Sequence, residues 1–267
     1  MKYRLSEIAR LCGGRVVGQD VTVCSILTDS RSCAFTGDAM FVAMRGENHD
    51  SHDYLKDMLR RGVNAFMIER EESVINMLDG VGCVVVDNAL TALQSLAAAH
   101  RRAFRGCVVG ITGSNGKTVV KEWLYQLLKD DYRITRSPKS YNSQIGVPLS
   151  IWQLSDKTEL AIFEAGISEQ GEMQRLQAII QPTIGVITYI GPEHGENFPS
   201  LQAKRAEKMQ LFANCPVVIE DPTHQNVRTC AAVMRALGYN EDTIAQRILQ
   251  QTHETILEVN LTALVDN

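Results

Sequence analysis

The chain has 267 residues, of which 45% are hydrophobic and 22% charged, and its formal net charge is −4. This length accommodates two compact domains with an ample core. The slightly acidic balance gives no general reason to bind nucleic acid or an anionic membrane. No apolar run is long enough to cross a bilayer, no signal-peptide core follows the N-terminus, and the seven cysteines include no C-x-x-C pair. We therefore expect a cytoplasmic protein with reduced thiols and no zinc site.

Residues 1–104 have the pattern of a small α/β domain. Three apolar segments predict strands, at 40–44, 65–68 and 83–86. An apolar stripe at helical spacing predicts a helix over 89–104, with His100 on the stripe and packed rather than catalytic. We place a domain boundary near Arg105.

The most informative segment is 107–118, CVVGITGSNGKT. Its first six residues predict a buried strand, and an amphipathic helix follows the glycine turn. Backbone amides and the helix dipole at such a turn favour an anion. Lys117 can bind terminal phosphates and Thr118 can ligate Mg²⁺. Because Ile111 stands where a standard P-loop has glycine, the match is to the shorter G-x-x-G-K-T form. An ordinary glycine turn with a solvated lysine is the alternative.

Strand and helix patterns alternate from 105 to 253, which indicates a mostly parallel sheet flanked by helices. Further strands are predicted at 159–163, 183–190 and 217–219, and further helices at 169–180 and 227–237. Ligands of such sheets collect at the carboxyl ends of the strands. Polar residues follow three strands there: Lys117 with Thr118, Glu164, and His194. We expect them to form one site, although a loop acid and a loop histidine that never meet would give the same pattern.

Five ordered motifs resemble those of the Mur ligases, ATP-dependent enzymes that build the peptide of bacterial cell-wall precursors. The matching segments are Thr112–Thr118 (the ATP loop), Tyr141–Pro148 (N-x3-G-x-P), Glu164–Gly166 with Gly171–Met173 (the Mg²⁺ segment), His194–Ser200 (H-x-E-x-F-x-S), and Thr28–Arg31 with Asp38–Gly46 (the UDP-sugar domain). The resemblance covers about residues 1–220. It implies an α/β fold with a small UDP-sugar-binding domain before a P-loop domain.

Within the family, the branch that joins D-alanyl-D-alanine to UDP-N-acetylmuramoyl-tripeptide is the most similar. The resemblance implies that a substrate carboxylate attacks the ATP γ-phosphate and that the amine of D-alanyl-D-alanine then attacks the acyl phosphate. Lys117, Glu164, His194 and Lys208 would be catalytic.

The same resemblance assigns ligand contacts to individual residues. ATP would contact Gly113, Ser114, Asn115, Gly116, Lys117, Thr118, Asn142 and Asn226. The UDP precursor would contact Thr28, Asp29, Ser30, Arg31 and Gly46. The Mg²⁺ ligands would be Thr118, Glu164, His194 and a carbamoylated Lys208. Lys204 is the second candidate for carbamoylation, and a solvated helix lysine is the alternative.

The sequence departs from the family after residue 220. Asp221–Ala232 resembles a late family helix whose asparagine, matched by Asn226, lies near adenine. The family's C-terminal domain has no counterpart, and 254–267 instead resembles the opening of alanine racemase, which indicates a fused racemase domain in the parent protein. We therefore expect nucleotide or precursor binding with ligase turnover weak or absent.

Two other interpretations compete with this one. A folylpolyglutamate-type ligase shares the fold, but residues 1–100 resemble a UDP-sugar domain that such enzymes lack. A non-catalytic nucleotide-binding fragment is favoured by the missing C-terminal region.

Overall fold

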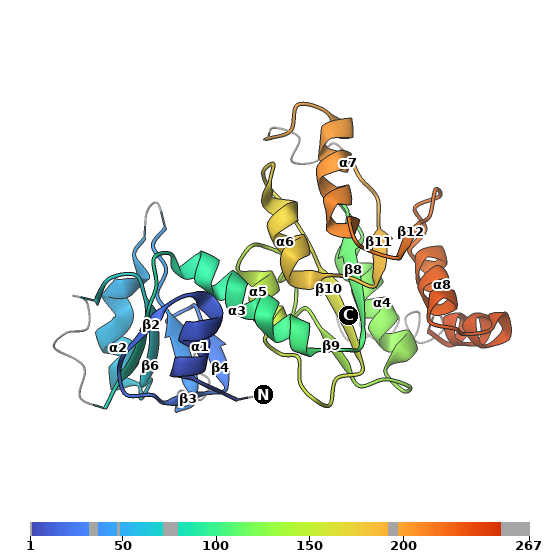
Figure 1. The fold of residues 1–267 in the computed structure, drawn as a ribbon. Coiled ribbons are helices and arrows are strands. Elements are labelled where there is room, and N and C mark those ends of the chain that lie inside the picture. The colour runs from blue at the N-terminus through green and yellow to red at the C-terminus, as the bar shows by residue number, and fades with distance from the viewer. Residues whose placement is uncertain (1, 32–36, 47–48, 72–79, 192–196, 252–267) are drawn as a thin grey trace, which may run out of the picture. The chain divides into compact units, whose positions relative to one another are not determined.

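The structure, a computed structural model, describes residues 2–31, 37–46, 49–71, 80–191 and 197–251. The chain forms two compact units (Figure 1). The first comprises Met1–Arg105 and Gln144–Asp156, and the second comprises Gly106–Ser143 and Lys157–Asn267. Each unit is an α/β structure with a largely parallel sheet. The α/β class was predicted for both units, and the parallel sheet was predicted for the second.

The first unit contains a five-stranded sheet in the order β2-β7-β6-β5-β4, in which only β2 is antiparallel to its neighbour. Its strands are β2 (Arg15–Gly18), β4 (Ser25–Leu27), β5 (Ala39–Val42), β6 (Ala65–Ile68) and β7 (Gly82–Val85), with β1 (Tyr3–Arg4) and β3 (Thr22–Val23) paired separately. Its helices are α1 (Leu5–Cys12), η1 (Ser51–Tyr54), α2 (Leu55–Arg60), α3 (Ala89–Ala103) and α5 (Gly146–Ile151).

Both faces of this sheet are buried. Met40 and Met67 belong to one hydrophobic cluster together with residues of α1 and α3, whereas Phe41 and Phe66 belong to another with residues of α2. Side chains alternate between the faces of a strand, so a strand covered on both sides consists of consecutive apolar residues. This explains why the sequence shows short apolar runs here rather than alternation.

Residues 144–156 belong to the first unit, whereas the predicted domain boundary near Arg105 assigns them to the second. Trp152 donates from its indole nitrogen to the carbonyl of Cys24 at 3.1 Å. His100 is bonded on both sides, through Nε2 to the carbonyl of Leu154 at 3.0 Å and through Nδ1 to the hydroxyl of Tyr3 at 2.8 Å. His100 is therefore a packed core histidine, as its place on the apolar stripe predicts.

The second unit contains a fully parallel sheet in the order β12-β11-β8-β10-β9. Its strands are β8 (Cys107–Thr112), β9 (Ile134–Arg136), β10 (Leu160–Glu164), β11 (Ile184–Ile187) and β12 (Val217–Glu220). Its helices are α4 (Lys117–Leu128), α6 (Glu172–Ile180), α7 (Leu201–Met209), η5 (Gln210–Phe212) and α8 (Asn226–Ala236), followed by helical residues 241–251.

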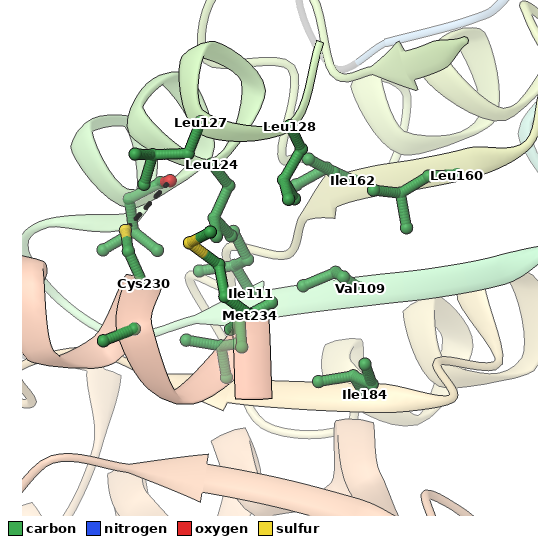
Figure 2. Close-up of a cluster of buried hydrophobic side chains, with 14 of the residues drawn as sticks. Val109, Ile111, Leu124, Leu127, Leu128, Leu160, Ile162, Ile184, Cys230 and Met234 are labelled. Carbon is green, nitrogen blue, oxygen red and sulfur yellow. Dashed lines mark hydrogen bonds between the residues drawn. The ribbon is translucent and has the colours of Figure 1, made fainter. Parts of the chain in front are cut away.

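Helices α4 and α8 cover one face of this sheet (Figure 2). Val109 and Ile111 of β8 pack there with Leu124 of α4 and with Cys230 and Met234 of α8. On the opposite face, a Cβ atom added at Gly185 of β11 would collide with the ring of Phe212, so η5 packs directly on that strand. The central position of β8 places the glycine turn between two neighbouring strands.

Several predicted boundaries differ from the observed ones. The strand predicted over 183–190 is observed only as the four residues of β11, because the segment that follows hydrogen-bonds to the glycine turn. The predicted helix 169–180 begins at Glu172, because Gly171 adopts a left-handed backbone. Strand β9 was not predicted, and the racemase-like segment 254–267 lies outside the described residues.

The six described cysteines are free thiols, but only Cys83 and Cys230 are buried. The other four described cysteines are half-buried. None of the helices in the described ranges combines the length and apolar character needed to cross a membrane.

Candidate active site

The glycine turn connects the end of β8 with the start of α4 and is held by the segment after β11. Gly113 and Gly116 have φ values of 150° and 87°, which favour glycine. A Cβ atom at Gly113 would collide with the Thr188 hydroxyl. The carbonyl of Tyr189 accepts hydrogen bonds from the amides of Ser114 at 2.7 Å and Asn115 at 3.3 Å. These two amides are therefore already bonded to the segment after β11. The backbone amides that could bind an anion are those in the first turn of α4.

Three lysine ammonium groups gather around this turn. Lys117 Nζ donates to the carbonyls of Gly113 and Ser114, both at 2.9 Å. Lys208 Nζ donates to the carbonyl of Gly113 at 3.1 Å, and Lys204 Nζ donates to that of Gly191 at 2.8 Å. Burial, together with the positive charges of Lys117 and Lys204, lowers the pKa of Lys208 to about 8.

Helix α7 presents two of these lysines one turn apart. Ser200 caps the helix by accepting a hydrogen bond from the amide of Ala203 at 3.1 Å. Lys204 and Lys208 are both buried, four residues apart on the same helical face. Between them, Glu207 accepts from the amides of Gly171 and Met173, which anchors α7 against the start of α6.

A cavity of about 330 Å³ lies beside the turn. Its described lining consists of Gly113, Ser114, Lys117, Asn142, Ser143, Gly166, Ile167, Ser168, Asn197, Lys204 and Lys208. Within the described part of the chain, this lining includes three ammonium groups and no carboxylate. The charge and the helix N-terminus together suit a polyanion such as a chain of phosphates.

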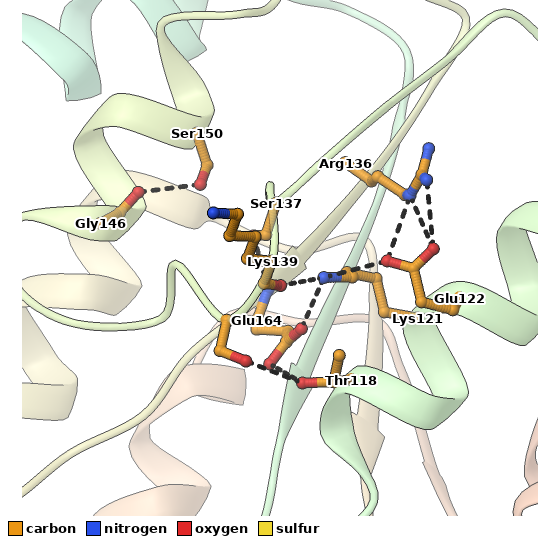
Figure 3. Close-up of polar contacts among 10 residues, drawn as sticks. Thr118, Lys121, Glu122, Arg136, Ser137, Lys139, Gly146, Ser150 and Glu164 are labelled. Atoms are coloured by element: carbon orange, nitrogen blue, oxygen red, sulfur yellow. Dashed lines mark hydrogen bonds and ion pairs between the residues drawn. The ribbon is translucent and has the colours of Figure 1, made fainter. Parts of the chain in front are cut away.

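A carboxylate lies next to the turn, at the end of β10 (Figure 3). Glu164 is fully buried; its Oε2 accepts a hydrogen bond from the Thr118 hydroxyl at 3.1 Å, and its Oε1 is 2.9 Å from Lys121 Nζ. Mg²⁺ bound to nucleotide phosphates prefers oxygen ligands and needs few of them from the protein. The paired oxygens of Thr118 and Glu164 fit such an ion.

Two asparagines complete the surroundings of the turn. The backbone carbonyl of Asn142 accepts from the amide of Gly166 at 2.8 Å, and its side chain lies against the Cα of Gly166. Asn226 is the first residue of α8, and its Oδ1 would lie 3.0 Å from a Cβ atom at Gly116. The turn, Asn142, Glu164, Lys208 and Asn226 therefore occur together in the second unit. His194 lies outside the described residues.

Four of the five candidate precursor residues line a pocket of about 530 Å³ in the first unit. Thr28, Asp29, Ser30 and Arg31 share it with Phe41, His49, Ser51 and Tyr54. The Arg31 guanidinium and amide donate to the Asp29 carboxylate, and these hydrogen bonds lower the pKa of Asp29 to about 2. Gly46 is not part of this lining, but its amide donates to the carbonyl of His49, a lining residue, at 2.7 Å.

Sequence reasoning missed several residues at both sites. The rings of His49 and Tyr54 lie 5.4 Å apart in the first-unit pocket, and those of Tyr189 and His224 lie 5.2 Å apart in the second unit. Lys121 was also missed, although it follows Lys117 by one helical turn. That spacing was the available signal, since residues four apart share a helical face.

Comparison with known proteins identifies the family. The family described as Mur ligase middle domain matches residues 111–261, more than half of the chain. A UDP-N-acetylmuramoyl-tripeptide–D-alanyl-D-alanine ligase of Bacillus subtilis (strain 168) is 29% identical over 277 residues, covering 99% of this chain and 60% of that protein. The protein of the same name from Rickettsia prowazekii is 35% identical over 175 residues, covering 66% of this chain and 38% of that protein.

Solved structures give the same result. The MurF ligase of Thermotoga maritima in complex with ADP matches with a TM-score of 0.64 and 29% identity, over 74% of this chain and 46% of that one. A MurF structure from Acinetobacter baumannii matches with a TM-score of 0.75 and 25% identity, over 87% of this chain and 52% of that one. The chain thus spans 60% or less of these relatives. It belongs to the Mur ligase family.

Proposed function

We propose that this chain is the nucleotide- and precursor-binding part of an ATP-dependent amide ligase of peptidoglycan precursor synthesis. Its reaction would join D-alanyl-D-alanine to UDP-N-acetylmuramoyl-tripeptide in the cytoplasm. The observation that carries the proposal is the grouping of three lysines and the Thr118–Glu164 oxygen pair around one helix N-terminus. The names of the relatives support the substrate assignment.

In this proposal, the second unit binds ATP and stabilises the charge that moves during phosphoryl transfer. Lys117 exchanges the carbonyls of the turn for the terminal phosphates, and the amides at the start of α4 bind the same anion. Thr118 and Glu164 would hold Mg²⁺, with His194 as a further proposed ligand, and the ion would supply positive charge beside the phosphates. A substrate carboxylate would attack the γ-phosphorus, and ADP would leave. Asn226, beside Gly116, lies near the nucleotide.

Lys208 is proposed to be carbamoylated, and Lys204 is the second candidate. Carbamoylation joins the neutral amine nitrogen to CO₂. Starting from the ammonium group, two protons are released, and a cation becomes an anionic oxygen donor. Lys208 is buried beside two other ammonium groups, so this change would relieve repulsion among three like charges. The product would offer a further hard ligand for a divalent cation.

The pocket of the first unit is the proposed site for the UDP precursor. Arg31 carries the charge for a phosphate, and the ring pair of His49 and Tyr54 offers an apolar surface for a base. We expect the two units to bind these two ligands, the nucleotide in the second unit and the UDP precursor in the first.

Calorimetry of ADP binding with Mg²⁺ tests the nucleotide site. Wild type should bind, and Lys117→Ala should lose most of the affinity while keeping its melting temperature; equal affinities would contradict the proposal. Thermal stabilisation by UDP-N-acetylmuramoyl-tripeptide but not by folate would separate this function from a folylpolyglutamate-type ligase. ATP binding without hydrolysis would identify a non-catalytic nucleotide-binding unit.

A further inference from the structure

Lys121 is a buried charge for which the nucleotide-binding scheme has no role. It lies on α4 one turn after Lys117, and the side chains of both Lys121 and Glu164 are 0% exposed. Burial of an ammonium group is unfavourable unless it is paired and hydrogen-bonded. The partners of Lys121 therefore indicate its role.

The ammonium group of Lys121 has three oxygen partners (Figure 3). Its Nζ is 2.9 Å from Glu164 Oε1 and 3.3 Å from Glu122 Oε1, and it donates to the backbone carbonyl of Lys139. The contacts with the two carboxylates are ion pairs, and the contact with the carbonyl is a hydrogen bond. The carbonyl belongs to a residue with φ of 47°, an uncommon conformation outside glycine.

The contact with Lys121 makes the two oxygens of Glu164 different. Oε1 is bound by the ammonium group, whereas Oε2 lies beside the Thr118 hydroxyl at the start of α4. Lysine is a compact point charge that can engage one carboxylate oxygen, whereas the arginine fork engages two at once. Lysine at this position therefore fixes the carboxylate and leaves one oxygen directed at the turn.

Lys121 also holds the loop 137–143, which contributes Asn142 and Ser143 to the cavity, by donating to the carbonyl of Lys139. Lys139 lies between Ser137, whose hydroxyl accepts from the amide of Glu164 at 3.1 Å, and Asn142, whose carbonyl accepts from Gly166. One ammonium group thus connects α4, the end of β10 and the loop that brings Asn142 to the cavity.

We propose that Lys121 is a positioning residue for metal binding. It holds Glu164 so that the carboxylate offers a single oxygen, Oε2, to the Mg²⁺ of a bound nucleotide. This inference rests on the proposed nucleotide function. Partners that orient a metal-ligating side chain are worth about 10- to 100-fold in metal affinity.

The test measures Mn²⁺ affinity by electron paramagnetic resonance at saturating ADP, with the 267-residue chain. Lys121→Met should lower this affinity by about 10- to 100-fold. Lys121→Arg should also lower it, because a guanidinium group would engage both Glu164 oxygens although the charge is kept. Lys129→Met, a change of the exposed lysine that directly follows the same helix, should have no effect. ADP affinity in EDTA should be unchanged in all variants.

The outcomes separate this inference from the proposed function. If wild type binds ADP equally with and without Mn²⁺, both are overturned. If wild type responds to Mn²⁺ but both Lys121 variants match it, only the role of Lys121 is overturned. The same holds if metal-free ADP affinity falls as much as Mn²⁺ affinity, or if Lys129→Met has an equal effect. If Lys121→Met does not fold, the Mn²⁺ affinity of Lys121→Arg, which keeps the positive charge, decides the question.

Discussion

The two units have similar sheets, but the charged side chains at their candidate sites are exposed in the first unit and buried in the second. In the first unit, the Asp29 and Arg31 side chains at the candidate precursor pocket are 45% and 89% exposed. In the second unit, the Lys121 and Glu164 side chains are 0% exposed, and Lys204 and Lys208 are also buried. Buried charges are costly to maintain and cluster at functional sites. The difference indicates that water is partly excluded from the second site, where phosphoryl transfer would occur, but not from the first.

The largest expected effect is loss of the buried ion pair. Glu164→Ala should destabilise the second unit by about 3–5 kcal/mol, because Lys121 would be left buried without its main partner. Urea denaturation measures this. Glu220→Ala, which breaks the more exposed pair with Arg205, is the control and should cost about 1 kcal/mol or less. Equal effects would mean that burial does not distinguish the two pairs.

The double variant Lys121→Met/Glu164→Leu sharpens the comparison. Replacing both charges with apolar groups should recover most of the stability lost in Glu164→Ala, while Mn²⁺-dependent ADP binding stays lost. Recovery of stability without metal binding would show that the pair is kept for function. Failure to recover any stability would show that the pair itself holds the unit together.

A smaller effect is expected at the glycine turn. Gly113→Ala should cost about 1–3 kcal/mol, since the φ of 150° is strained for alanine and its Cβ atom would collide with Thr188. ADP affinity should fall as well, because the turn shapes the anion site. Gly171→Ala in the same unit, where φ is also positive but nothing lies within 4 Å of the added atom, is the matched control. Similar melting temperatures for the two variants would contradict the packing argument.

The first unit should respond to mild acid through His100. Burial lowers the pKa of His100 below its usual value near 6.5, so the unfolded chain gains a proton before the folded chain does. Stability from this group is present above pH 6.5 and is lost as pH falls below that value. The melting temperature of wild type should therefore drop more than that of His100→Gln between pH 7.5 and 5.5. A parallel decline in both would exclude His100 as the cause.

The smallest effect on stability is expected at the exposed pair of the first unit. Asp29→Asn should leave the melting temperature nearly unchanged, because exposed ion pairs contribute little. Binding of the UDP precursor should nevertheless weaken, since Asp29 orients Arg31 through paired hydrogen bonds. Calorimetry with the UDP precursor measures this, and unchanged affinity would remove Asp29 from the proposed site.

Local patterns predicted much of the second unit. The apolar run 107–112 is strand β8 with the predicted limits, and the helix after the turn begins at Lys117. These elements were predictable because a buried strand requires a continuous run of apolar residues and an amphipathic helix requires apolar residues at helical spacing. Strand β9, with three half-buried residues, shows neither pattern. The return of 144–156 to the first unit could not be predicted either, since it depends on Trp152 meeting a carbonyl 128 positions away.

The sequence by itself determined the family, the α/β architecture and the turn where α4 begins, because each is encoded in consecutive residues. Only the tertiary structure decided which oxygen of Glu164 is committed to Lys121, which lysines gather at Gly113, and that Tyr189 bonds the amides of Ser114 and Asn115. These contacts join residues dozens of positions apart. Their chemistry depends on burial and on direction, two properties that a residue acquires only when its neighbours in space are fixed.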